Sequence, residues 1–297
     1  MGYDTFPVPG REVLANDFQM ALGSASAICA TGLARLGNHV RFAGVVGRDI
    51  WGEYCINALR AEAVDISAVR TVADMKTGVT VSISNASDRA LITFPGTITA
   101  LKASDISDEL LQSVEHLHVS SYFLQAGLRC GCRDLLTRAS EFGLTISLDP
   151  GFDPAEQWDP QMLELLPLID LFLPNEVELA GLTKTQDIAK ALRFLDNGHT
   201  LTVAKLGSRG AATWVGGNLV SRAALCIHPV DTTGAGDSFN AGFLHAWLHR
   251  ATVEDALLFA CACGALSTRA PGGIAGQPTL DEARAFLSQS GAALRRD

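Results

Sequence analysis

Helix-like and strand-like apolar segments alternate through most of the 297-residue chain. Short runs rich in Val, Ile and Leu predict buried strands, and longer runs with apolar residues three or four positions apart predict helices. The predicted strands cover residues 39–46, 116–120, 145–148, 171–173 and 202–205, and the predicted helices cover 25–36, 130–142, 163–169, 188–195, 238–248 and 253–268. This alternation is typical of βαβ units and predicts an α/β fold with a mostly parallel sheet.

Two stretches depart from the alternation. Residues 13–20 are strand-like, and residues 78–94 alternate polar and apolar positions on both sides of a turn, which predicts a β-hairpin. We expect a small β-lid, formed from about 6–22 and 71–98, beside a cleft at the strand ends. The sequence contains no repeat, low-complexity segment or linker, so residues 1–297 are expected to form a single domain with this lid.

A short glycine-rich segment carries the strongest chemical signal. It reads Asp231-Thr232-Thr233-Gly234-Ala235-Gly236-Asp237 and runs directly into the predicted helix 238–248. Gly234 and Gly236 leave backbone amides accessible, and these amides would bind phosphate together with the positive end of the following helix. Asp237 beside such a site fits a general base that accepts a proton from an attacking hydroxyl. The same carboxylate could instead only cap the helix, and the residues alone leave both interpretations open.

The glycine-rich segment closely resembles the signature of the PfkB, or ribokinase-like, carbohydrate kinase family. Further matches follow in the family's order at residues 7–10, 33–37, 44–52, 174–178 and 205–210. The resemblance covers nearly the whole chain. It implies a ribokinase-like three-layer sandwich, with helices on both faces of a mostly parallel central sheet and a small β-lid. It also implies ATP-dependent transfer of a phosphoryl group to a hydroxyl of a sugar-like substrate.

The resemblance assigns roles in phosphoryl transfer. Asp237 would deprotonate the substrate hydroxyl, and the turn at 234–236 would form the anion hole. Asn175 and Glu178 match an N-x-x-E element that would organise Mg²⁺, through water, around the phosphates of ATP. A hydrated dication of this kind prefers oxygen ligands and retains several waters.

Two further groups would bind nucleotide and a monovalent ion. Lys205, Gly207 and Gly210 follow a predicted strand, where a lysine and a glycine turn could contact nucleotide phosphate. Lys205 could equally be a solvated charge at the strand end. Asp231 and Thr233, with carbonyls between Thr268 and Gly273, resemble the family's loop for a monovalent cation, which implies activation by K⁺.

The beginning of the sequence departs from the family. The family normally opens with a sheet strand that ends in an aspartate holding sugar hydroxyls. Met1 lies too close to the match at 7–10 for this strand to fit. Either the start of the protein lies upstream of Met1, or the enzyme lacks this strand and its carboxylate.

The substrate turn departs as well. Where many sugar kinases have Gly-Gly-x-x-x-Asn, residues 23–28 read Gly-Ser-Ala-Ser-Ala-Ile. The final isoleucine cannot hydrogen-bond a sugar, whereas Ser24 and Ser26 could. Gln125 and Asp149 follow predicted strands, and α/β sheets bind ligands at the carboxyl ends of their strands, so both are candidate substrate residues.

Charges in the lid bear on the kind of acceptor. Within residues 71–98 the only cations are Lys76 and Arg89, offset by Asp74 and Asp88. A phosphorylated acceptor would need a pair of cations around its phosphate, so we expect an unphosphorylated sugar. Arg89 could hold one carboxylate, which leaves a sugar acid open, or it could only cap the hairpin.

Composition excludes several partner classes. The net charge of −9 and the pI near 5.2 argue against nucleic acid, which needs a basic surface. No stretch approaches the ~18 consecutive apolar residues of a membrane span. The seven cysteines include two C-x-C pairs and fit free thiols in a reducing compartment, so we expect a cytoplasmic protein. We expect these pairs to be core residues rather than a zinc site, because no histidine accompanies them.

Two other functions remain open at this point. A nucleoside kinase would need an aromatic slot for the base, which Phe123 and Trp158 could form, although both fit the core as well. A non-catalytic sensor could retain the nucleotide site and use the altered turn at 23–28 for ligand binding. Either way, the exposed hairpin of the lid predicts a homodimer, because exposed strand edges associate readily.

Overall fold

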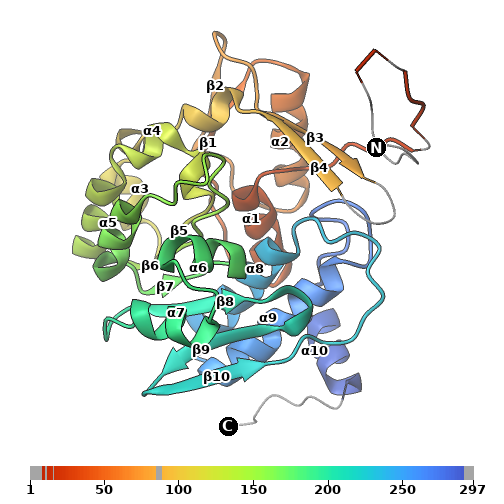
Figure 1. The fold of residues 1–297 in the computed structure, drawn as a ribbon. Helices are drawn as coiled ribbons and strands as arrows, with labels where there is room; N and C mark the ends of the chain where they lie inside the picture. Colours follow the sequence, from red (N-terminus) through yellow and green to blue (C-terminus); the bar gives the residue numbers. More distant parts are fainter. Residues whose placement is uncertain (1–8, 11, 16, 85–88, 291–297) are drawn as a thin grey trace.

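Six strands form the main sheet of the computed structural model, which describes residues 9–290 except 11, 16 and 85–88. Strands β5 (His116–Val119), β6 (Thr145–Leu148), β7 (Leu171–Phe172) and β8 (Leu201–Lys205) run parallel in chain order. Strands β9 (Ala211–Val215) and β10 (Asn218–Arg222) extend the sheet antiparallel beyond β8 (Figure 1). The parallel arrangement gathers the carboxyl ends of β5–β8 at one edge, where the candidate site lies.

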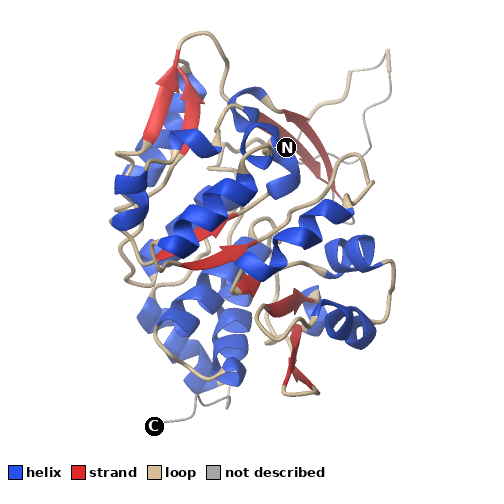
Figure 2. Cartoon of the chain, turned by 90° about the vertical axis from the view of Figure 1, so that its left-hand side faces the viewer, coloured by secondary structure: helices blue, strands red, loops and turns tan. Residues whose placement is uncertain are grey.

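Helices cover both faces of this sheet (Figure 2). The α-helices are α1 (Ala25–Arg35), α2 (Ile50–Ala61), α3 (Asp108–Gln112), α4 (Ala126–Arg129), α5 (Cys132–Glu141), α6 (Glu176–Thr183), α7 (Ile188–Leu195), α8 (Ala235–Leu248), α9 (Val253–Ser267) and α10 (Leu280–Gln289). One buried cluster joins α1, α8, α9 and α10 to one face, and another joins α5, α6 and α7 to the other. The predicted three-layer α/β sandwich is therefore confirmed.

Close packing of α8 against α9 fixes the helix that carries the glycine-rich segment. A Cβ added at Gly242 would lie 2.8 Å from the Cβ of Cys263, so glycine permits the two helices to approach. Cys261 and Cys263 are buried in this contact, as expected for core residues. Of the other C-x-C pair, Cys132 is buried, whereas Cys130 is exposed and the prediction of a core residue is wrong for it. Thr252 begins α9 by accepting a hydrogen bond from Asp255 N through its side chain. The N-terminal turn of α8 is thus held by a rigid helix pair.

Two smaller sheets stand apart from the main one. Strands β1 (Gly44–Gly47) and β2 (Val69–Val72) form a separate parallel pair, although the sequence predicted one continuous sheet. Strands β3 (Val79–Ser84) and β4 (Arg89–Phe94) form the predicted antiparallel hairpin, and its turn lies outside the described residues. Figure 1 shows this hairpin projecting beside α2.

Three local predictions need correction. The described residues within 13–20 form no continuous strand: Asp17 alone makes an isolated β-bridge, and the apolar Leu14 and Phe18 are exposed. The helix predicted over 163–169 is part of a 3₁₀ segment (Pro160–Leu168), since Pro167 cannot donate the bond that an α-helix needs. The β9–β10 hairpin was not predicted. Among the described residues, no helix has both the length and the apolar character to cross a bilayer.

Candidate active site

The N-terminal turn of α8 presents backbone amides to the sheet edge. Gly234 adopts a left-handed conformation (φ +73°), which a side chain would strain, and Ala235 N donates to Thr232 O. The first helical bond of the turn runs from Ser238 N to Gly234 O. The amides of Gly236 and Asp237 precede that bond and are among the N–H groups that a helix start leaves for a ligand. The turn therefore has the geometry of an anion site, and binding of phosphate there stays a prediction.

Asp237 lies half-buried in this first turn. Burial, together with the neighbouring Asp149 carboxylate, raises the pKa of Asp237 to about 7, and Lys205 partly opposes the rise. A carboxyl group with a pKa near neutrality exchanges a proton readily at working pH, which is what a general base requires. The Asp237 side chain is thus suited to chemistry as well as to helix capping.

A buried ion pair supports the turn from beneath. Lys205 Nζ, at the end of β8, donates to Asp149 Oδ2 over 2.6 Å, and the two residues are 9% and 4% exposed. A Cβ added at Gly236 would lie 3.9 Å from Lys205 Nζ, so the ammonium group sits directly against the anion turn. The alternative of a solvated strand-end charge is therefore wrong for Lys205. Contact with ATP phosphate stays a prediction, and the position beside the turn is compatible with it.

The Asp149 carboxylate is held by three donors. Besides Lys205, it accepts a hydrogen bond at Oδ2 from Asn240 Nδ2 and one at Oδ1 from Gly151 N (2.9 Å). These bonds give Asp149 an internal role, which is to fix Lys205 and to set the charge around Asp237. Its predicted contact with substrate stays a prediction.

Asn240 is a site residue that the sequence analysis did not identify. It is fully buried, and its Oδ1 has no hydrogen-bond partner among the described residues. Asn240 follows Asp237 by three positions, so both project from the same face of α8. That spacing was visible in the sequence, but the partner Asp149 lies 91 positions away and only the fold brings it close.

Asn175 and Glu178 form a reciprocal cap at the start of α6. Asn175 Oδ1 accepts bonds from Val177 N and Glu178 N, and Glu178 accepts from Asn175 N (2.8 Å) and Asn175 Nδ2 (2.7 Å). Asn175 also bridges to Lys205 beside β8. Burial, then the Asp149 charge, raises the pKa of Glu178 to about 8.

The local charges suit a hydrated dication. Asp149, Glu178 and Asp237 interact with one another and with a single cation, Lys205. Among the described residues, no group of three His, Cys, Asp or Glu side chains could bind a metal directly. Binding of Mg²⁺ by Glu178 and Asn175, through water and through the phosphates that it accompanies, stays a prediction.

The glycines after β8 shape the chain reversal into β9. Gly207 has φ +56° and Gly210 has φ +95°. A Cβ at Gly210 would lie 2.0 Å from Arg222 O, so no other residue fits there. Gly210 is explained by this turn, and ATP binding by Gly207 and Gly210 stays a prediction.

The predicted monovalent-cation loop is tied to the segment after α9. Asp231 Oδ1 accepts bonds from Thr233 N and Thr233 Oγ1, while Asp231 Oδ2 accepts one from Gly272 N (2.8 Å). Val230 N also donates to Thr268 O. The two segments expected to share a cation therefore lie together, and cation binding stays a prediction.

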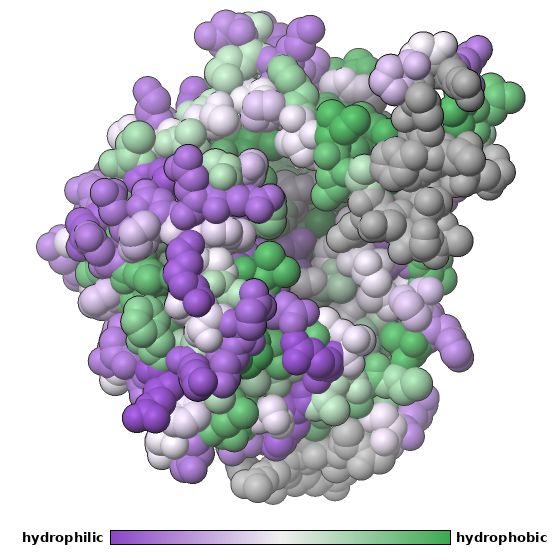
Figure 3. Space-filling view, in the orientation of Figure 1, coloured by the Kyte–Doolittle hydropathy of each residue, from purple (hydrophilic) through white to green (hydrophobic). Residues whose placement is uncertain are grey.

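The substrate turn is explained in part by packing. Ile28 is buried, and a Cβ at Gly273 or at Gly234 would lie within 3.0 Å of its side chain, so Ile28 supports the anion turn from below. Ser24 is exposed and Ser26 is half-buried at the start of α1. The surface of Figure 3 is hollowed close to this helix. Substrate contacts by Ser24 and Ser26 stay predictions.

The other substrate candidates differ in how far the structure describes them. Gln125 Nε2 donates to Ser120 O, and Gln125 lines the same cavity as Ser26. Arg89 begins β4, and its side chain lies outside the described features. Phe123 and Trp158 pack edge to face and are buried, so they are core residues rather than an open slot for a nucleobase.

Comparisons with known proteins agree with this geometry. The sequence matches the pfkB family of carbohydrate kinases over residues 3–280. It is 29% identical over 295 residues to a ribokinase of Haemophilus influenzae, and 30% identical over 287 residues to an ATP-dependent ribose-1-phosphate kinase of Halopiger xanaduensis; each alignment covers 96% of this chain and 93% of the relative. The structure of Arabidopsis thaliana ribokinase complexed with ribose and ATP aligns with a TM-score of 0.83 and 26% identity, over 96% of this chain and 94% of that one. The chain belongs to the pfkB family of carbohydrate kinases.

Proposed function

We propose that the protein transfers the γ-phosphoryl group of ATP to a hydroxyl of an unphosphorylated sugar or sugar acid, with Asp237 as general base. The observation that carries this proposal is the Asp237 carboxyl, with a pKa near 7, in the same turn as the Gly236 amide. The proton acceptor and the anion site would then lie on either side of the reacting hydroxyl and phosphoryl group, as in-line transfer requires.

Each group has a distinct task in this scheme. Asp237 takes the proton of the substrate hydroxyl as its oxygen attacks. The amides at the start of α8 stabilise the charge that develops on the transferred group, and the Lys205 ammonium adds a positive charge beneath them. Mg·ATP, when bound, supplies the phosphoryl group and part of its charge neutralisation.

A substrate panel tests the proposal. Purified protein with Mg·ATP is assayed against neutral sugars, sugar acids, nucleosides and sugar phosphates, including ribose 1-phosphate. We expect an unphosphorylated sugar or sugar acid to give the highest kcat/KM. A sugar phosphate turned over better than every unphosphorylated acceptor would contradict the proposed substrate class. Absence of turnover with all four classes would contradict the kinase proposal itself.

The pH dependence should report the carboxyl group of Asp237. A base works when ionised, so kcat/KM should fall as the pH drops through about 7 rather than through the ordinary range near 3.8. Asp149 raises this pKa, so Asp149→Asn should move the acidic limb to lower pH in a kcat/KM profile. Exposed Asp281 on α10 offers a matched control, and Asp281→Asn should leave the limb in place. If kcat/KM of Asp149→Asn fell at the same acidic pH as that of the unsubstituted enzyme, a group other than Asp237 would be titrating.

Glu178→Gln should raise the Mg²⁺ concentration needed for half-maximal rate. The substitution keeps the shape of the α6 cap but removes a carboxyl group whose ionised form, populated as the pH rises through about 8, would stabilise the ion, so the titration is run above that pH. The measurement is a Mg²⁺ titration at fixed ATP. Glu176→Gln is the control. Glu176 lies two residues before Glu178 and is half-exposed, so its substitution should not change the Mg²⁺ titration. Identical Mg²⁺ curves for Glu178→Gln and the unsubstituted enzyme would remove Glu178 from the ion site.

Three finer assignments complete the proposal. K⁺ would bind between Asp231, Thr233 and the 268–273 segment, which rates in K⁺ and Na⁺ buffers would test. The exposed apolar side chains of the hairpin, Leu91, Ile92 and Phe94, support a homodimer formed through the lid, which a mass measurement in solution would test. A cytoplasmic location is proposed from the free cysteines and would be tested by cell fractionation.

A further inference from the structure

The segment between α9 and α10 contains a buried glutamine that the proposed mechanism does not use. Gln277 is 4% exposed. The preceding Gly276 lies against the end of α9, where an added Cβ would lie 2.2 Å from Ser267 O. A buried amide needs hydrogen-bond partners, because burial removes its donors and its acceptor from water. The partners of Gln277 therefore indicate what its side chain does.

Both donor hydrogens of the Gln277 amide are used on elements of the candidate active site. Nε2 donates to Ile28 O of α1 over 2.8 Å and to Ser238 Oγ of α8 over 2.9 Å. A carbonyl oxygen can only accept, so the nitrogen and not the oxygen of the amide must face Ile28. An amide nitrogen carries two hydrogens, and these two bonds use both. One planar group thus joins α1 to the start of α8.

Both partners of Gln277 lie beside the anion turn at 234–236. Ser238 directly follows Asp237, and its amide makes the first helical bond of α8, to Gly234 O. The side chain of Ile28 supports the turn from below, because a Cβ added at Gly234 would lie 3.0 Å from Ile28 Cγ2. A shift of α1 relative to α8 would therefore move the turn and the Asp237 carboxylate together.

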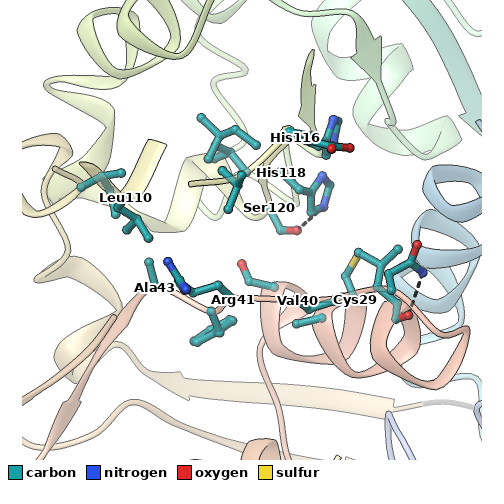
Figure 4. A pocket seen from close by; sticks show the side chains of 18 of the residues that line it. Cys29, Val40, Arg41, Ala43, Leu110, His116, His118 and Ser120 are labelled. Carbon is teal, nitrogen blue, oxygen red and sulfur yellow. Dashed lines mark hydrogen bonds between the residues drawn. The ribbon is translucent and has the colours of Figure 1, made fainter. Parts of the chain in front are cut away.

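The opposite face of α1 is only partly packed. Cys29 lines a cavity of about 600 Å³, and Figure 4 shows Ser120 across the open space. Empty space supplies no contacts that could hold the helix. Ile28 and Gly32 lie on the other face, four positions apart, and a Cβ added at Gly32 would lie 2.9 Å from Gln277 Nε2. The position of α1 against α8 therefore depends on the face that contacts Gln277.

An ion pair holds the backbone of Gln277 from outside. Arg35 Nη1 donates to Gln277 O over 3.0 Å and to Ile274 O over 2.6 Å. The same guanidinium binds both carboxylate oxygens of Glu62, at the end of α2, over 2.7 and 2.6 Å. A bidentate pair of this kind fixes orientation as well as distance. The amide of Gln277 thus extends from a fixed backbone into the contact between α1 and α8.

Stability alone does not explain an amide at this position. Gln277 Oε1 is buried and has no hydrogen-bond partner among the described residues. An unpaired buried oxygen is unfavourable and offsets part of what the two donated bonds contribute. An apolar side chain of similar length would lose those bonds but would also remove the unpaired oxygen. Orientation of two elements by two donors, in contrast, requires the amide.

We propose that Gln277 is a positioning residue for Asp237. Its amide fixes α1 relative to α8 and so holds the anion turn and the carboxylate in their reactive arrangement. The kinetic consequence rests on the proposed kinase function, whereas the structural consequence can be measured without any substrate.

Gln277→Met tests the proposal, because it removes both donors at nearly constant side-chain length. With Mg·ATP and the sugar that gives the highest kcat/KM in the substrate panel, we expect kcat to fall by ~10–10², as for a catalytic group displaced by about 1 Å. The KM values for ATP and sugar should stay within about twofold of those of the parent, and Tm within about 3 °C. Gln289→Met makes the same change at an exposed position of α10 and should alter neither rate nor Tm.

Hydrogen exchange of the protein without ligands gives a second readout. Exchange of the amides at 234–240 should accelerate by about fivefold or more in Gln277→Met, while exchange in α7 stays the same. Ser238→Ala removes one of the two acceptors and should lower kcat less than Gln277→Met does. The double variant should have the kcat of Gln277→Met alone, because both substitutions remove the same bond.

Several results would overturn the positioning role. They are an unchanged kcat in Gln277→Met, unchanged exchange at 234–240, and effects of Gln277→Met and Ser238→Ala that multiply in the double variant. A Tm lower by more than about 10 °C would show that the amide mainly stabilises the fold. If the parent turned over none of the acceptors but exchange at 234–240 accelerated in Gln277→Met, the proposed kinase function would be wrong, and the link between α1 and α8 would stand.

Discussion

Asp237→Asn is expected to lower kcat by ~10²–10⁴, the usual contribution of a positioned general base. Asparagine has nearly the same shape and keeps a polar group in the first turn of α8, so the amide site for phosphate should persist. The KM for ATP should therefore change little. Steady-state kinetics at saturating sugar and ATP, beside a direct ATP-binding measurement, separate the two effects.

The same variant should not be less stable than the unsubstituted enzyme above neutral pH. Burial raises the pKa of Asp237 from 3.8 to about 7, so the folded state favours the protonated form. The stabilisation linked to that proton is present below pH 3.8 and is lost as the pH rises through about 7. At pH 8 the neutral asparagine avoids the buried charge, so its Tm should equal or exceed that of the parent. Unchanged turnover in Asp237→Asn would place the base elsewhere, and a much lower Tm would make any loss of activity uninformative about chemistry.

Lys205→Met is expected to lower the free energy of unfolding by about 3–5 kcal/mol, the range measured when one partner of a buried ion pair is removed. The Asp149 carboxylate would remain buried, 4% exposed, with only Asn240 and Gly151 as donors. Activity should fall as well, because the positive charge beside Gly236 is lost. Urea unfolding at pH 7, with initial rates on the folded fraction, measures both effects.

Two further variants separate charge burial from general loss of packing. The double variant Lys205→Met with Asp149→Leu removes both charges and should recover much of the stability, but not the activity. Arg209→Met breaks an exposed ion pair with Glu176 and should cost no more than ~1 kcal/mol. If Lys205→Met cost as little as Arg209→Met, the Lys205–Asp149 pair would not be the structural centre of the site.

Local sequence determined the elements and the reactive turn. The strand at 145–148 and the helix at 188–195 have the predicted bounds, because their apolar periodicity is strong and their ends carry clear caps or turns. The turn at 234–236 could be identified for the same reason: amides, glycines and the Asp237 carboxylate are neighbours in the chain. Chemistry built from consecutive residues is visible before the chain folds.

Only the tertiary structure decided how charges are paired and how the sheet is divided. Lys205 looked like a possible solvated charge because its partner Asp149 lies 56 positions away, and burial is a property of the assembled fold. Ile28 looked unsuited to a substrate turn until packing placed it under Gly234 and Gly273. The sequence showed that the family's first strand does not fit before residue 7, but it did not show that β1 would stand apart from β5, because strand pairing depends on which edges meet in space. Periodicity specifies that a segment is a strand, whereas long-range packing decides its neighbours.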